Sequence, residues 1–126
     1  MKCSVGGLYQ QRKEVILVDG LILLNGSNWQ DFFNKKITYV MFSKSDCEQC
    51  KILETHIAST YLEKPFPLAK LTLDRPGFAG LKQKFPWISR IDTLPFNTIF
   101  SGGKLVDSWS GSSFEVLKNK LIEFSN

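Results

Sequence analysis

Two cysteines, Cys47 and Cys50, are separated by two residues in the stretch SKSDCEQCKIL at positions 43–53. An apolar run precedes them and a helix-like pattern follows them. Two thiols at this spacing can exchange disulfides, can bind a metal ion as thiolates, or can simply pack against other side chains. The surrounding residues have to distinguish these three roles.

The helix expected after the pair favours disulfide exchange. Apolar residues recur at helical spacing over 48–63 until Pro65 interrupts the pattern. Cys47 would stand at the helix N-terminus, where free backbone amides and the helix dipole stabilise a thiolate. Cys50 would lie one turn further in, where its sulfur can attack a mixed disulfide on Cys47. We therefore expect Cys47 to be the nucleophile and Cys50 the resolving cysteine.

Charged residues around the pair act in opposite directions. Asp46 and Glu48 disfavour a thiolate on Cys47 by repulsion, whereas Lys44 and Lys51 favour it. All four neighbours are expected to modulate the reactivity of the pair, and the sequence leaves the direction of their net effect open.

The metal alternative lacks ligands. A structural zinc site takes four. Besides the pair, the chain offers the remote Cys3, scattered carboxylates and His56, which is the only histidine. His56 follows Cys50 by six residues, too far along the helix to exchange a proton with Cys47. We expect no metal ion and no other cofactor.

The elements before the pair follow from the apolar pattern. Residues 37–42, ITYVMF, predict a central strand buried on both faces. Residues 15–24 predict a hairpin around the Asp-Gly pair at 19–20, or a single strand with an appended segment. Ser27 is expected to cap a helix over 28–35.

The elements after the pair alternate in the same way. The pattern predicts a strand at 67–73, a short helix at 78–85, a hairpin of strands at 96–100 and 104–109, and a closing helix at 114–124. This order predicts a sheet with helices on both faces.

Composition limits the class of protein. The chain has 126 residues, of which 43% are hydrophobic, enough for one domain over 13–126 after a loose segment at 1–12. Three cysteines cannot all pair within the chain, which argues against a secreted disulfide framework.

The charge pattern argues against nucleic acid as a partner, and the apolar pattern argues against a membrane. The net charge is +4, but the lysines are spread without a basic run, as on a solvated surface and unlike a nucleic-acid footprint. The apolar residues 15–24 are interrupted and too few, since about 20 are needed to span a bilayer. We expect a cytoplasmic protein that binds neither nucleic acid nor membrane.

Over residues 20–125 the chain resembles the thioredoxin superfamily. Four landmarks in order carry this resemblance: CEQC at 47–50, AKLTLD at 69–74 as the third strand, IDTLP at 91–95 as the cis-proline segment, and Gly102-Gly103-Lys104 with Gly111 as the closing hairpin. The resemblance implies an α/β thioredoxin-like fold, with a central mixed β-sheet flanked by helices on both faces.

The resemblance also implies a function. The protein would be a monomeric dithiol-disulfide oxidoreductase that acts on protein disulfides and is served by an electron donor. The Leu94-Pro95 bond would be cis and would face Cys47, exposing the Leu94 backbone to an extended substrate. The alternative is an ordinary trans proline opening a strand. Gly111 and Trp109 would line the same groove, although Trp109 could equally be packed as a strand residue.

The chain departs from the family pattern around the pair. The family often has Trp before the first cysteine and Gly-Pro between the two, where this chain has Asp46 and Glu48-Gln49. The family's buried acid six residues before the first cysteine is replaced by Met41, while its lysine neighbour is retained as Lys70, which is expected to modulate the pair. Proton transfer to and from Cys50 is therefore left open.

Two further questions stay open. The segment 86–90 is longer than the family needs, and it either adds a binding surface with an exposed Trp87 or packs that side chain. We favour a reductase because no export signal is found. The alternatives are an exported disulfide oxidase or isomerase, and a binding module that uses the groove around Pro95 and does little redox chemistry.

Overall fold

Six strands form one sheet in a computed structural model that describes residues 17–18, 20–59 and 64–125. The expected loose segment at 1–12 lies outside the described residues. The strands follow one another across the sheet in the order β1-β2-β4-β3-β5-β6. Their bounds are β1 Leu17–Val18, β2 Leu21–Leu23, β3 Thr38–Ser43, β4 Leu68–Thr72, β5 Phe96–Ser101 and β6 Lys104–Ser110.

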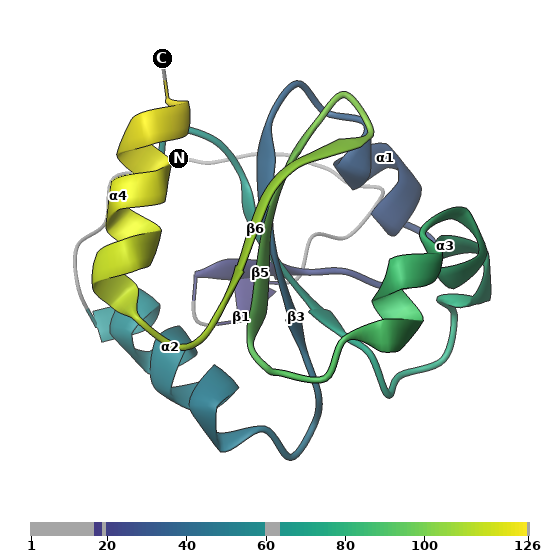
Figure 1. Cartoon of the computed structure of the whole chain (residues 1–126), viewed down its shortest axis with the longest axis horizontal. Helices are drawn as coiled ribbons and strands as arrows, with labels where there is room; N and C mark the ends of the chain where they lie inside the picture. The colour runs from purple at the N-terminus through teal and green to yellow at the C-terminus, as the bar shows by residue number, and fades with distance from the viewer. Residues whose placement is uncertain (1–16, 19, 60–63, 126) are drawn as a thin grey trace, which may run out of the picture.

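Helices cover both faces of this sheet, as predicted. They are α1 Trp29–Phe33, α2 Glu48–Ser59, α3 Ala79–Lys84, the 3-10 helix η2 Pro86–Arg90 and α4 Phe114–Phe124. Figure 1 shows α2 and α4 on one side of the strands and α1 and α3 on the other. None of the helices in the described part of the chain is long and apolar enough to cross a membrane.

The sheet is mixed, which confirms the predicted class. β4 runs parallel to both β2 and β3, whereas β5 and β6 are antiparallel additions on the other side of β3. β1 pairs with β2 in antiparallel register, with Leu17 opposite Ile22. The first strands therefore form the predicted hairpin, and Gly20 in its turn has a φ of 79° that favours glycine.

The central strand β3 is buried along its whole length. Because side chains alternate along a strand, it serves two cores. Val40 and Phe42 belong to the cluster on the α1 and α3 side, whereas Tyr39 and Met41 belong to the cluster under α2 and α4. β3 therefore holds the two layers of helices to one sheet.

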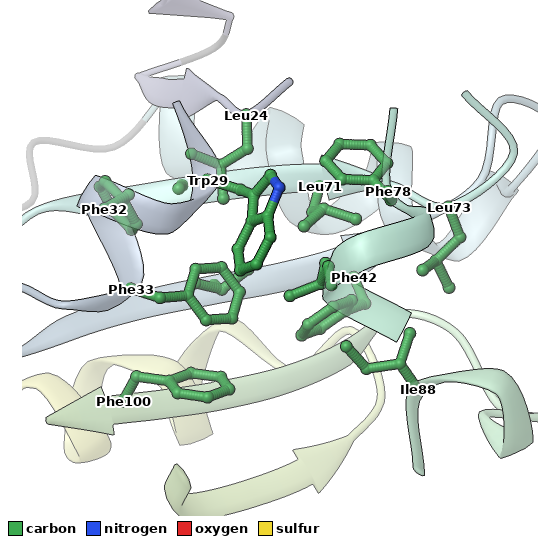
Figure 2. Packing of buried hydrophobic residues seen from close by; sticks show 13 residues of the cluster. Leu24, Trp29, Phe32, Phe33, Phe42, Leu71, Leu73, Phe78, Ile88 and Phe100 are labelled. Atoms are coloured by element: carbon green, nitrogen blue, oxygen red, sulfur yellow. The ribbon is translucent and has the colours of Figure 1, made fainter. Parts of the chain in front are cut away.

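Aromatic rings fill the core on the α1 and α3 side (Figure 2). The ring of Phe33 lies 4.4 Å from that of Phe100 and meets Trp29 edge-on at 5.9 Å, centroid to centroid. These contacts fasten the short helix α1 to β5. Burial of large rings is the main stabilising interaction available to a helix of only five residues.

The start of α1 differs from the prediction. Ser27 does not cap the helix; the N-cap position is Asn28, whose side chain caps no helical amide. Instead the side-chain oxygen of Asn25 accepts hydrogen bonds from the amides of Ser27 at 2.8 Å and Asn28 at 2.9 Å. An asparagine that bonds the backbone two or three residues ahead forms its own turn, and this turn fixes the chain just before the helix without capping a helical amide.

This turn generates a stability prediction. Asn25→Ala removes both bonds, and we expect the free energy of unfolding to fall by about 1 kcal/mol, the typical net contribution of an intramolecular hydrogen bond. Ser27→Ala should change it by less than about 0.5 kcal/mol, as for most surface substitutions. Urea unfolding of both variants tests this, and a larger loss in Ser27→Ala would contradict the assignment.

Candidate active site

Cys47 and Cys50 form a disulfide across the first turn of α2, with their Cα atoms 5.3 Å apart. Cys47 directly precedes the helix and is half-buried, whereas Cys50 is fully buried. The backbone amide of Cys50 donates a hydrogen bond to the sulfur of Cys47 at 3.1 Å. After reduction, an amide in this position would stabilise a thiolate on Cys47, which is the electrostatic effect predicted for a helix N-terminus.

The loop before Cys47 is tied to the neighbouring strand. The carboxylate of Asp74, which follows β4, accepts hydrogen bonds from the Ser45 amide at 3.2 Å and from the Ser45 hydroxyl at 3.1 Å. Partial desolvation raises the pKa of Asp74, but the bonds from Ser45 outweigh it, so the pKa lies below its ordinary value of 3.8. The ionised form of Asp74 therefore binds Ser45 of this loop more strongly than the protonated form does.

The two acids that flank Cys47 in sequence are exposed. The Glu48 side chain is 82% exposed and lies 3.9 Å from Lys51. Charges so well solvated interact weakly, because water and salt screen them. We therefore expect Asp46 and Glu48 to modulate Cys47 less strongly than the helix N-terminus does.

The Leu94-Pro95 bond is cis, as the resemblance implied, so the alternative of a trans proline is wrong. Leu94 and Cys47 pack against the same buried cluster under α2 and α4. The carbonyl of Pro95 accepts a hydrogen bond from the amide of Gly111 at 2.9 Å. Gly111 has a φ of 111° that disfavours a side chain, although the space beside it is empty.

The structure gives Trp109 a packing role. Its ring is half-buried, lies 6.1 Å from that of Tyr39 and is covered by the amine of Lys120 at 5.4 Å. These contacts show that Trp109 packs as a strand residue, and its expected place in the substrate groove stays a prediction.

Two polar side chains that sequence reasoning missed fix the loop after β6. The buried amide of Asn97 donates to the carbonyls of Trp109 at 3.2 Å and Gly111 at 3.0 Å. The hydroxyl of Ser112 donates to the side-chain oxygen of Gln49 at 2.7 Å. Gln49 lies between the two cysteines, so this bond joins the redox pair to the loop. Nothing in the sequence spacing could reveal either contact.

The segment 86–90 is a short 3-10 helix that packs its tryptophan and also borders a groove. Trp87 is half-buried, and its ring lies 5.8 Å from Phe42 and 5.9 Å from Phe96. A shallow groove of about 340 Å³ lies between this helix and the face of β6. Phe96 and Ser110 line it, and Phe96 directly follows the cis-proline.

A buried charge pair lies in the layer beneath α2. Glu54 of α2 and Lys70 of β4 are 3.0 Å apart, and their side chains are only 6% and 17% exposed. Lys70 was expected to modulate the site, but Glu54 was missed. One signal could have found it: Glu54 falls on the buried stripe of the helix with Cys50, Leu53 and Ile57.

The described residues contain no group of three or more His, Cys, Asp or Glu that could hold a metal ion. His56 is exposed and stacks on Phe114, with 5.9 Å between the ring centroids. Cys3 lies outside the described residues.

Comparison with solved structures identifies the fold. No family model and no curated protein sequence matches the chain. Thioredoxin f2 of Chlamydomonas reinhardtii is similar in structure, with a TM-score of 0.66 and 15% identity over 82% of this chain and 95% of that one. Oxidised thioredoxin O2 of Arabidopsis thaliana has a TM-score of 0.66 and 16% identity over 86% and 96% of the two chains.

A Fasciola hepatica thioredoxin reaches 21% identity at a TM-score of 0.63, over 80% of this chain and 96% of its own. At such identities the likeness establishes the thioredoxin fold alone. The cysteine pair at the start of α2 fits the CxxC motif of that superfamily.

The different burial of the two cysteines predicts their order of alkylation. When the reduced protein is treated with iodoacetamide at neutral pH, Cys47 should be labelled before Cys50, because only a solvent-accessible thiolate reacts readily. Peptide mass spectrometry over a time course measures both rates, in a Cys3→Ser background. Equal rates, or faster labelling of Cys50, would remove the assignment of Cys47 as the nucleophile.

The bonds of Asp74 predict a pH dependence. Its lowered pKa means that the carboxylate stabilises the fold above the ordinary value of 3.8, and that this contribution is lost as the pH falls through the lower folded value. The melting temperature of Asp74→Ala should therefore lie below that of the wild type at neutral pH, and the gap should close at strongly acidic pH.

Thermal unfolding across that pH range measures the gap. Asp46→Ala is the control, because Asp46 is an exposed acid of the same loop. A gap of the same size at every pH for Asp74→Ala would show that the Ser45 bonds do not depend on the charge.

Proposed function

We propose that this chain, a thioredoxin-fold protein with a disulfide between Cys47 and Cys50, is a dithiol-disulfide oxidoreductase that acts on protein partners. One observation carries the proposal: the two cysteines are bonded at a helix N-terminus, with Cys47 half-buried and Cys50 enclosed. This asymmetry suits an attacking thiol and a resolving thiol, because only the first has to meet a partner.

The reaction proceeds in two exchanges. The Cys47 thiolate attacks one sulfur of the partner's disulfide, that disulfide breaks, and the other partner sulfur leaves and takes up a proton. Cys50 then loses its proton and attacks the sulfur of Cys47, so that a Cys47–Cys50 bond forms and the second partner sulfur leaves as a thiolate. The partner gains two electrons and the pair loses two, so an electron donor must reduce the pair before the next cycle.

An extended segment of the partner is the expected substrate form. Leu94, before the cis-proline, would pair its backbone with that segment, because backbone pairing recognises partners of many sequences. Gly111 supports this recognition, since the space beside its Cα is open. We expect the protein to act as a monomer.

We propose reduction in the cytoplasm as the direction of exchange. The low cysteine count supports this, since proteins of oxidising compartments tend to carry structural disulfides. The reduction potential of the pair tests it: a value near that of thioredoxin, about −270 mV, agrees with a reductase, whereas a value near about −120 mV would favour the oxidase.

The mechanism predicts that Cys50→Ser traps partners. The variant should retain the attack by Cys47 but lack the sulfur that releases the mixed disulfide, so partners stay covalently attached. Purification of this variant from the native cell, in a Cys3→Ser background, should yield complexes that dissolve on adding reductant.

Cys47→Ser in the same background is the matched control and should trap almost nothing. Insulin reduction with dithiothreitol should be lost in both variants. If both variants retain the same partners without a covalent bond and the parent protein reduces no insulin, the chain is a binding module.

A further inference from the structure

Glu54 is a buried carboxylate that the two exchanges described above do not use. Glu54 as a whole is only 5% exposed to solvent. Glutamate is almost never buried so completely unless it is paired, and here Lys70 supplies the pairing charge at 3.0 Å. Such a pair is weak evidence for stability, since two apolar side chains of similar size often stabilise a core as well or better. A role other than stability therefore has to be considered.

Its position relates it to Cys50. Glu54 follows Cys50 by four residues in α2, and both belong to the buried side of that helix. Residues four apart are neighbours on one face of a helix, which places Glu54 one turn after Cys50 on the same buried side. Both residues are buried, with exposures of 0% for Cys50 and 5% for Glu54.

The tyrosine and the lysines of this layer do not offer Cys50 a proton acceptor. The hydroxyl of Tyr39, on β3, is fully buried and donates to Asn97 of β5. Burial, and secondarily the negative charge of Glu54, raises the pKa of Tyr39 far above neutral, so it keeps its proton. Lys70 of β4 is paired with Glu54, and Lys120 of α4 is bonded to Asp107 of β6 at 2.6 Å. Asp107 belongs to β6, so Glu54 is the carboxylate of this layer that shares the buried side of α2 with Cys50.

We propose that Glu54 accepts the proton of Cys50 when that thiol resolves the mixed disulfide, and returns it in the reverse reaction. The inference rests on the proposed function and names a further residue for it. The S–H bond of Cys50 breaks, and its proton passes to a carboxylate oxygen of Glu54, directly or through one water molecule. The freed electron pair forms the bond to the sulfur of Cys47, and the bond between Cys47 and the partner breaks. The partner leaves as a thiolate, and Glu54 then releases its proton to solvent.

This role gives a reason for a charged pair at a buried position where two apolar side chains would also fit. A neutral acid could not accept a proton, and Lys70 provides the positive charge beside which Glu54 can be ionised in a buried position. Lys70 positions and stabilises the acceptor and is not itself part of the transfer.

The experiment separates the two exchanges in time. Reduced protein in a Cys3→Ser background is mixed with oxidised glutathione, and acid-quenched samples are analysed by mass spectrometry for the Cys47–glutathione mixed disulfide and for the oxidised pair. In Glu54→Gln the amide oxygen can still accept a bond from Lys70, but the side chain cannot take up a proton. We expect the first exchange to be unchanged and the second to slow by about 10²-fold or more at neutral pH, the typical effect of losing a general base.

The pH profile distinguishes proton transfer from a structural role. As the pH rises, Cys50 ionises without help, so the deficit of Glu54→Gln should shrink. A deficit of the same factor at every pH, a slowing of both exchanges, or a second exchange at the wild-type rate would overturn the inference. Glu115→Gln, which changes an exposed acid of α4, is the matched control and should behave as the wild type.

Glu54→Asp provides a second test that does not depend on the folding of Glu54→Gln. Aspartate keeps the acid, so its second exchange should retain the wild-type pH dependence at a reduced rate, and loss of that dependence would overturn the inference. If the wild-type protein forms no mixed disulfide or does not resolve it, the proposed function itself fails, which is a different result from equal rates in the wild type and Glu54→Gln.

Discussion

The burial of β3 on both faces is the constraint on which the rest of the structure depends. A strand without a polar face requires a layer of helices on each side, and its alternating side chains assign Val40 and Phe42 to one core and Tyr39 and Met41 to the other. The end of such a strand is the first point at which the chain can reach solvent. Cys47 follows that end after a short loop, which explains how a reactive thiol lies at the surface while its partner is enclosed.

The site itself is assembled from four loops that are distant in sequence. Each is fixed by a polar contact to another loop or strand: Ser45 to Asp74, Pro95 to Gly111, Asn97 to Gly111, and Gln49 to Ser112. The geometry around the cysteines therefore depends on all of these contacts together. Because Gln49 bonds Ser112, a substitution of Gln49 also removes a contact of the loop before α4.

The sequence predicted the strands, the long helices and the cysteine pair, because these depend on local periodicity and on a spacing within one turn. The cis-proline followed only from resemblance, since Leu94-Pro95 has no local feature that requires it. The expected cap by Ser27 is wrong, because Asn25 forms a turn with the amides of Ser27 and Asn28 and the helix begins one residue later, at Trp29. Glu54 lies on the buried stripe of α2, but its pairing with Lys70 of β4 joins residues 16 apart in sequence, which local periodicity does not reveal.

The two edges of the sheet differ from its centre in a way that affects how the protein behaves in a crowded cell. Within the described residues β1 is only two residues long, and β6 carries Lys104 and Asp107 and is distorted by an irregularity opposite Ile99 and Phe100. Short, charged or irregular edges are poor templates for adding another strand. Both edges are therefore expected to resist pairing with exposed strands of other chains, which limits edge-to-edge aggregation of this protein.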